Sequence, residues 1–109
     1  MNKFCLALDL KDDPDLIEQY KKHHELVWPE ILESIRESGI LKMEIYQVSN
    51  RLFMIIETND NFSFEKKTNM DSSNEKVKEW EALMDTYQQR IPFAKPGSKW
   101  VLMDKIFEL

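Results

Sequence analysis

Glycine and cysteine are scarce in this chain of 109 residues, and their scarcity excludes some kinds of binding site and any internal disulfide. The two glycines, Gly39 and Gly97, stand far apart, whereas phosphate loops of the Walker and Rossmann kinds need several glycines close together. The single cysteine, Cys5, cannot form an internal disulfide, which fits a reducing compartment. The composition therefore excludes a Walker or Rossmann nucleotide site and favours a cytoplasmic location.

Long apolar runs and a surplus of basic residues are also missing. No apolar run is long enough to span a bilayer, and residues 1–10 are too short and too soon acidic for a signal peptide. The 15 Lys and Arg residues are outnumbered by 20 Asp and Glu residues, which gives a net charge of −5. Because no basic patch is visible, we expect neither nucleic acid nor an anionic membrane as a partner.

Histidine is equally rare, since the only two are the neighbours His23 and His24. On a helix, consecutive side chains point in different directions, so these two rings cannot converge on one ion. Zinc sites need ligands that converge. We therefore expect no metal site and no cofactor.

The rest of the composition is that of an ordinary globular protein, 42% apolar and 11% aromatic. A chain of this length can bury a core without disulfides or metals, so we expect residues 1–109 to form one domain. Apolar periodicity and turn residues then predict the secondary structure. The predicted elements are a strand at 3–10, a helix at 14–38 that Pro29 kinks or breaks near Val27 and Trp28, hairpin strands at 40–48 and 51–58, two short helices within 59–90 that break around 70–73, and a last strand at 100–109.

This order is the split β-α-β pattern of a ferredoxin-like α+β fold. The helices would cover one face of an antiparallel sheet. In the first hairpin strand, Leu41, Met43 and Ile45 are predicted to share a face. The opposite face of the sheet still carries apolar side chains, and a second copy of the chain is the simplest cover for them. The sequence therefore predicts a sheet-to-sheet homodimer.

The candidate site lies in the stretch EQYKKHHELVWPE, residues 18–30. Tyr20, His24 and Trp28 are spaced by one helical turn each and are predicted to share the inward stripe. His23 is rotated by about 100° and is predicted to lie nearer solvent. His24 is a candidate general acid or base in a half-buried cleft, and the alternative is a core histidine bonded to a carbonyl or to Tyr20.

Trp28 and Tyr20 could also serve a ligand, together with Trp80 of the predicted last helix. An indole face beside a phenol and an imidazole is typical of carbohydrate sites, where a ring stacks on the sugar and polar tips read its hydroxyls. The alternative for all three aromatic side chains is plain core packing. The residues alone leave both interpretations open.

The motif Tyr-x-x-x-His-x-x-x-Trp-Pro-Glu, which falls on Tyr20, His24, Trp28, Pro29 and Glu30, resembles that of the L-rhamnose mutarotase family. The resemblance extends along nearly the whole chain, to the closing FEL. It implies a dimeric ferredoxin-like α/β barrel that interconverts the α and β anomers of a 6-deoxyhexopyranose without a cofactor. It also implies His24 as the proton donor, Tyr20 as a sugar-binding residue, and Trp80 as the first of two adjacent tryptophans in the sugar pocket.

Two positions depart from the pattern of the rhamnose enzymes. The second tryptophan of the pair is Glu81 here, and a tyrosine near the start of the second strand is Met43. Both positions touch the sugar in the family. The resemblance therefore implies a deoxysugar substrate but leaves L-rhamnose open, with L-fucose as the obvious other candidate.

Two further functions are compatible with the predicted fold. One is a cofactor-free monooxygenase of the dimeric α+β-barrel type, which would need a large apolar cavity for a flat substrate. The other is a non-catalytic binding or dimerisation module in which the aromatic residues and His24 are core. Fold alone does not separate these functions from a mutarotase, whereas the family motif favours the mutarotase.

Overall fold

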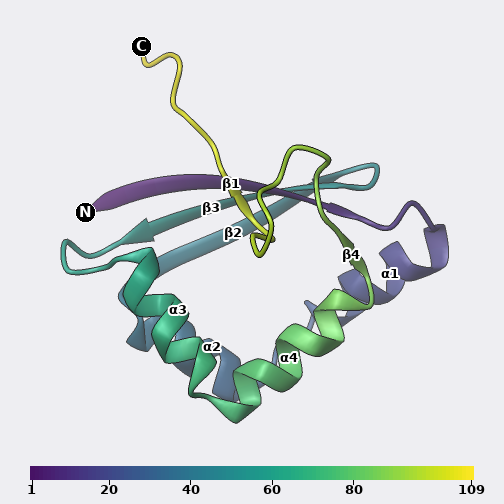
Figure 1. Ribbon diagram of the computed structural model, residues 1–109, viewed down its shortest axis with the longest axis horizontal. Helices are drawn as coiled ribbons and strands as arrows, with labels where there is room; N and C mark the ends of the chain where they lie inside the picture. The colour runs from purple at the N-terminus through teal and green to yellow at the C-terminus, as the bar shows by residue number, and fades with distance from the viewer.

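The computed structural model describes all 109 residues and has the predicted ferredoxin-like α+β architecture. Its elements are β1 (Asn2–Leu10), α1 (Pro14–His23), α2 (Pro29–Glu37), β2 (Ile40–Val48), β3 (Arg51–Thr58), α3 (Phe64–Ser72), α4 (Glu75–Asp85), β4 (Gln88–Gln89) and β5 (Val101–Leu102). The strands form one antiparallel sheet in the order β2-β3-β1-β4, and β5 also pairs with β1. All four helices lie on one side of the sheet (Figure 1).

Pro14 and Pro29 each begin a helix, which splits the helix predicted at 14–38 into two. Before Pro14, the Asp13 carboxylate accepts hydrogen bonds from two backbone N–H groups of the first turn of α1. α1 ends at His23, and the chain is irregular until α2 begins. A proline has no N–H to donate and is well placed in a first helical turn, where that donor would be unpaired. The predicted interruption is confirmed, and it is a full break between two helices.

The β2–β3 hairpin is confirmed, with one correction at its first residues. The turn is Ser49-Asn50, where Ser49 takes a left-handed φ of 51°. A β-bulge lies at the start of β2, so that Leu41 is an extra residue without a partner on β3. The side chain of Leu41 is 59% exposed and Ile40 is buried in its place. The bulge shifts the alternation of side chains by one residue, so the prediction that Leu41 shares the inward face of Met43 and Ile45 is wrong.

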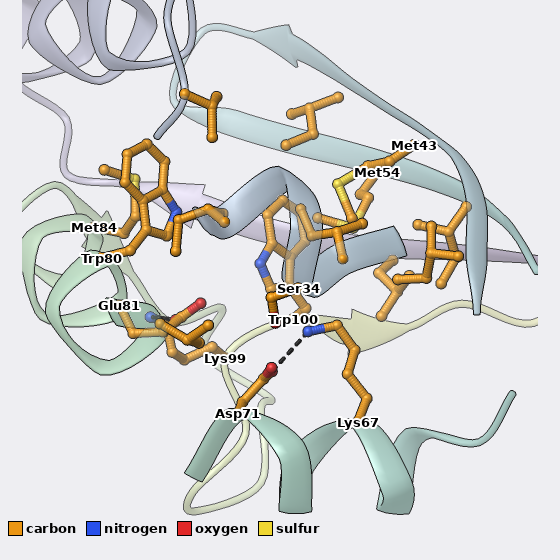
Figure 2. A pocket seen from close by; sticks show the side chains of 18 of the residues that line it. Ser34, Met43, Met54, Lys67, Asp71, Trp80, Glu81, Met84, Lys99 and Trp100 are labelled. Carbon is orange, nitrogen blue, oxygen red and sulfur yellow. Dashed lines mark hydrogen bonds and ion pairs between the residues drawn. The ribbon is translucent and has the colours of Figure 1, made fainter. Parts of the chain in front are cut away.

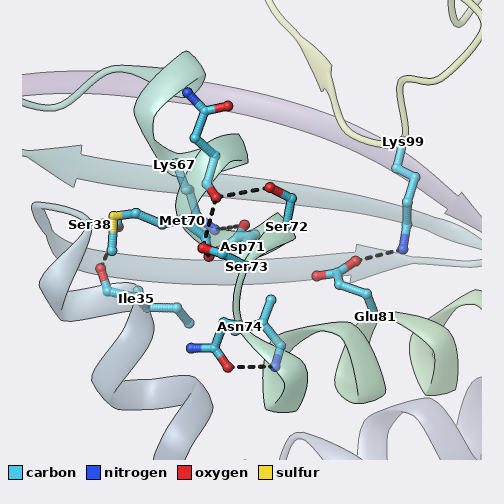
Figure 3. Close-up of polar contacts among 12 residues, drawn as sticks. Ile35, Ser38, Lys67, Met70, Asp71, Ser72, Ser73, Asn74, Glu81 and Lys99 are labelled. Atoms are coloured by element: carbon cyan, nitrogen blue, oxygen red, sulfur yellow. Dashed lines mark hydrogen bonds and ion pairs between the residues drawn. The ribbon is translucent and has the colours of Figure 1, made fainter.

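The two helices predicted within 59–90 are α3 and α4, which meet at Ser73 and Asn74. The Asn74 side-chain oxygen accepts hydrogen bonds from the N–H groups of Lys76 and Val77 and caps α4 (Figure 3). The predicted inward face of α4 is confirmed, because its apolar residues are buried against the sheet and α1. The main core cluster consists of Leu10, Tyr20, Ile31, Leu52, Val77, Trp80, Met84 and Tyr87.

The predicted last strand at 100–109 is largely wrong. Only Val101 and Leu102 pair with β1, and the Met103 N–H donates to the Cys5 carbonyl at 2.8 Å. Residues 104–109 then leave the body of the chain as an extended arm on the side of the sheet away from the helices (Figure 1). Nothing in a single chain pairs with this arm. The short strand β4 was not predicted, since two residues carry no periodicity.

None of the four helices has the length and apolar character needed to cross a bilayer.

Candidate active site

A cavity of about 1100 Å³ lies between the sheet and the helices. Figure 2 shows Trp80 and Met84 at one end, Met43 and Met54 at the other, and Trp100 between them. Tyr20 and His24 also line this cavity. The predicted residues of the first helix therefore meet Trp80 of α4 and Met43 of β2 around one space.

Tyr20 and His24 are placed together by the last turn of α1. The His24 backbone N–H donates to the Lys21 carbonyl and ends the helix, so the imidazole lies one turn beyond Tyr20. Its Nδ1 is 2.8 Å from the backbone oxygen of Tyr20. The two rings meet edge to face, with centroids 4.4 Å apart and an interplanar angle of 83°. The two side chains therefore form a fixed pair.

The contact with the Tyr20 carbonyl determines which nitrogen of His24 carries the proton. A carbonyl oxygen can only accept, so Nδ1 is the N–H donor and the other nitrogen, Nε2, holds a free lone pair when the ring is neutral. Burial lowers the pKa of His24; the Tyr20 carbonyl opposes this shift, and the nearby charge of His23 adds to it. At neutral pH the ring is therefore a neutral base.

Tyr20, unlike His24, is a proton donor at neutral pH. Its side chain is buried, and burial raises its pKa to about 12, a shift that the Gln88 amide opposes and the charge of Glu81 supports. The phenol is therefore protonated at neutral pH and is able to donate its hydrogen. A protonated phenol beside a neutral imidazole is a pair of acid and base with separate roles.

Trp80 forms the wall beside His24, whereas Trp28 lies behind Trp80. The Trp80 and His24 ring centroids are 5.7 Å apart at an angle of 68°, and Trp80 lines the cavity. Trp28 packs on Trp80 at 5.1 Å, carries the Lys76 ammonium over its ring at 5.8 Å, and is not among the lining residues. The break before Pro29 accounts for this placement, since it removes Trp28 from the stripe of α1.

The prediction that His23 lies nearer solvent than His24 stays a prediction, since both side chains are half-buried. His23 also has a partner in the chain. It is half-buried, and its Nε2 lies 3.1 Å from the hydroxyl oxygen of Tyr87, whose O–H donates to Gln19. Tyr87 follows α4 directly, and it covers the outer side of α1 at His23. The helical wheel gives the angle between the two histidines correctly but cannot show that a second segment packs on that side.

The two positions that depart from the rhamnose pattern, Met43 and Glu81, both line the cavity. Glu81 accepts a hydrogen bond from the Lys99 ammonium at 2.7 Å (Figure 3). Asp85 lies 3.0 Å from the same ammonium. The Lys99 side chain is only 18% exposed. The wall at Glu81 is therefore charged rather than aromatic.

Gln88, Lys99 and Trp100 are among the lining residues that the sequence did not single out as site candidates. Gln88 and Lys99 lie in segments without apolar periodicity, so no pattern indicates them. Trp100 was assigned only to the last strand. The chain places no group of three or more His, Cys, Asp or Glu side chains where they could hold a metal ion.

Known proteins are similar to this chain in sequence and in fold. Residues 3–109 match the L-rhamnose mutarotase family. An L-fucose mutarotase of Xanthomonas campestris pv. campestris is 36% identical over 111 residues, covering 100% of this chain and 89% of the relative.

Among solved structures, the L-rhamnose mutarotase of Formosa agariphila superposes with a TM-score of 0.73 at 20% identity, covering 100% of this chain and 99% of its own. A dimeric ferredoxin-like protein from an uncultured marine organism superposes with a TM-score of 0.57 at 14% identity. The superposition covers 98% of this chain and 90% of the neighbour. These structures show the ferredoxin-like fold, and the match over residues 3–109 shows the family. The chain belongs to the L-rhamnose mutarotase family.

Proposed function

We propose that this protein interconverts the α and β anomers of a 6-deoxy-L-hexopyranose, L-fucose or L-rhamnose. The observation that carries the proposal is the edge-to-face pair of the His24 imidazole and the Tyr20 phenol at the wall of a cavity, with ring centroids 4.4 Å apart. Membership in the L-rhamnose mutarotase family supports it. No observation favours a monooxygenase or a non-catalytic module.

Ring opening needs one proton taken and one given, and the pair supplies both. The Nε2 of His24 takes the proton of the anomeric hydroxyl while the Tyr20 hydroxyl gives its proton to the ring oxygen. The bond between the ring oxygen and the anomeric carbon breaks, and that carbon becomes an aldehyde. No electron is gained or lost, so acid–base catalysis is sufficient.

Ring closure is the reverse reaction on the other face of the aldehyde. After the carbonyl carbon rotates about its bond to the next carbon, the sugar hydroxyl attacks it and returns its proton to the Tyr20 oxygen. The His24 imidazolium gives its proton back to the anomeric oxygen. His24 thus acts first as a base and then as the proton donor that the family resemblance implies.

The remaining predicted residues form the sugar pocket. Trp80 lines the cavity beside His24 and offers an indole surface to the apolar face of a sugar. We assign Trp28 to fixing Trp80 from behind, because it touches Trp80 and not the cavity. Met43 and Glu81 complete the walls. The charged wall at Glu81 and the relative named L-fucose mutarotase make L-fucose our first candidate.

We also propose that the protein acts as a homodimer. The outer face of the sheet exposes Tyr46 and Val48, and the arm at 104–109 exposes Ile106 and Phe107, which are 95% and 76% accessible. One chain covers none of these side chains, and the marine neighbour of the same fold is a dimer. Analytical ultracentrifugation should give a molar mass twice that of one chain. The substitution Phe107→Asp should lower the measured mass toward that of a single chain. A wild-type protein that sediments as a single chain would contradict the dimer.

The cavity draws its walls from segments between β1 and the 95–100 loop, so we propose that residues 1–109 act as one domain. The lone cysteine and the small-molecule substrate are consistent with the predicted cytoplasmic location.

The test of the proposed function is exchange NMR on a panel of L-fucose, L-rhamnose and related hexoses. Irradiation of one anomeric proton should reduce the signal of the other anomer in the presence of protein, above the uncatalysed rate. Exchange of at least one 6-deoxy-L-hexose supports the proposal. The absence of added exchange for every sugar of the panel overturns it.

A further inference from the structure

Gln88 contacts Tyr20 of the proposed pair and also lines the cavity. It belongs to β4, pairs with Leu10 of β1, and lines the cavity. Its amide nitrogen donates to the Tyr20 hydroxyl oxygen over 3.5 Å. Its amide oxygen is the only buried side-chain polar atom of the chain without a hydrogen-bond partner.

An unpaired buried amide is unfavourable, and such groups in folded proteins usually have partners. Turning the amide by 180° does not remove the problem. The Tyr20 hydroxyl would then donate to the oxygen, and the nitrogen would be the atom left without a partner. In either orientation one end of the amide contacts Tyr20 and the other end is buried without a partner in the chain, while the Gln88 side chain lines the cavity. The unpaired end therefore meets a ligand only when the Gln88 side chain turns toward the cavity.

We propose that the free end of the Gln88 amide binds a sugar hydroxyl at carbon 2 or carbon 4 and thereby determines which deoxysugar is preferred. This inference rests on the proposed mutarotase function. Tyr20 faces the ring oxygen in that reaction, so a group bonded to Tyr20 lies close to the same part of the sugar. The anomeric oxygen belongs to His24, and carbon 5 carries a methyl group, which cannot form a hydrogen bond. The next hydroxyls outward are those on carbons 2 and 4.

Those two carbons are where L-fucose and L-rhamnose differ in configuration. A residue that binds either hydroxyl therefore senses the difference between the two sugars. A hydroxyl both donates and accepts, so it suits the free end of the amide in either orientation. Gln88 therefore recognises the sugar, and it also affects the position of the Tyr20 hydroxyl through their contact.

The test compares Gln88→Met with Gln89→Met on the sugar panel. Methionine keeps the length of glutamine and removes its hydrogen-bonding groups, whereas Gln89 lies beside it in β4, is exposed and is not among the lining residues. Gln88→Met should lower kcat/KM for the preferred sugar about tenfold, the size expected for one lost hydrogen bond, and bring the rates of L-fucose and L-rhamnose closer together. Gln89→Met should change neither. The melting temperature of Gln88→Met is measured beside the rates and should change little, because the substitution removes one unpaired buried atom and leaves the buried Tyr20 hydroxyl unpaired in exchange.

Analogues of the preferred sugar that lack the hydroxyl at carbon 2 or carbon 4 identify the contact. On the analogue that lacks the bound hydroxyl, the difference in kcat/KM between wild type and Gln88→Met should shrink to the part that comes from the contact with Tyr20. A loss of the same factor on every sugar and analogue would make Gln88 only a support for Tyr20 and would overturn the proposal, as would no loss at all. A wild type that exchanges no sugar overturns the proposed function, and with it this role of Gln88.

Discussion

The two walls of the cavity differ in how the chain builds them. The α1 wall consists of Tyr20 and His24, four residues apart on one helix and joined by a 2.8 Å hydrogen bond. The α4–β5 wall consists of Trp80, Glu81, Gln88, Lys99 and Trp100, which come from a helix, a two-residue strand and a loop. In the proposed reaction the first wall moves protons, and the second surrounds the rest of the sugar.

This difference separates reaction from recognition. The groups of the α1 wall are needed for any sugar that mutarotates, because every such sugar has an anomeric hydroxyl and a ring oxygen. The groups of the α4–β5 wall can only favour one arrangement of hydroxyls over another. Substitutions in the α1 wall should therefore lower the rate of anomer exchange equally for all sugars. Substitutions in the α4–β5 wall should change which sugar is preferred.

The largest effect is expected from His24→Ala, which removes the base of the α1 wall. General acid–base catalysis contributes about 100-fold to 10,000-fold, so kcat should fall by about 1000-fold on every sugar of the panel. Exchange NMR measures this fall. The control is His23→Ala, because His23 contacts Tyr87 and does not line the cavity, and it should keep most of the activity. Equal losses for the two histidines would remove the basis for assigning the reaction to His24.

A somewhat smaller effect is expected from Tyr20→Phe. Phenylalanine keeps the ring against His24 and removes the hydroxyl that protonates the ring oxygen, so kcat should fall by about 100-fold on all sugars while water serves as a poorer acid. Tyr87→Phe is the matched control, since its ring is stacked on Tyr20 and its hydroxyl faces His23 and Gln19. A Tyr20→Phe protein with full kcat would exclude Tyr20 as the acid.

The same contrast explains what the sequence could predict. The stripe of α1, the inward face of α4 and the hairpin depend on local spacing. They are confirmed except at Trp28, which does not belong to α1, and at Leu41, which lies at the bulge. Pro29 predicted the interruption of the first helix, but not that the interruption would separate two helices. The bulge at Leu41 and the packing of Tyr87 on His23 depend on backbone irregularity or on tertiary packing, which no period records. Gln88 and Lys99 were missed for the same reason, because their role arises only where β4 and the 95–100 loop meet the cavity.

The smallest effect is expected from Lys99→Met in the α4–β5 wall. Lys99 bonds both Glu81 and Asp85, and its loss leaves two partly exposed carboxylates beside the cavity. The expected result is a rise in KM of about threefold, the scale of a partly exposed ion pair, with kcat nearly unchanged and a shift in the preference among sugars. Lys95→Met, in the same loop but exposed, is the control. A fall in kcat alone, equal for all sugars, would contradict the division between the walls.

The central claim is that His24 begins the reaction as a neutral base, and the pH dependence of kcat/KM tests it most directly. Burial lowers the pKa of His24 from its ordinary value of 6.5, so the ring stays neutral to a lower pH than a free histidine. After the uncatalysed rate is subtracted, kcat/KM should be constant near pH 7 and fall tenfold per pH unit on the acid side of an inflection below pH 6.5. His23→Ala should retain an inflection and move it slightly toward pH 6.5, because the charge of His23 contributes to the lowering of the pKa of His24. A catalysed rate that rises as the pH falls through this range would show that protonated His24 is the active form and would contradict the account.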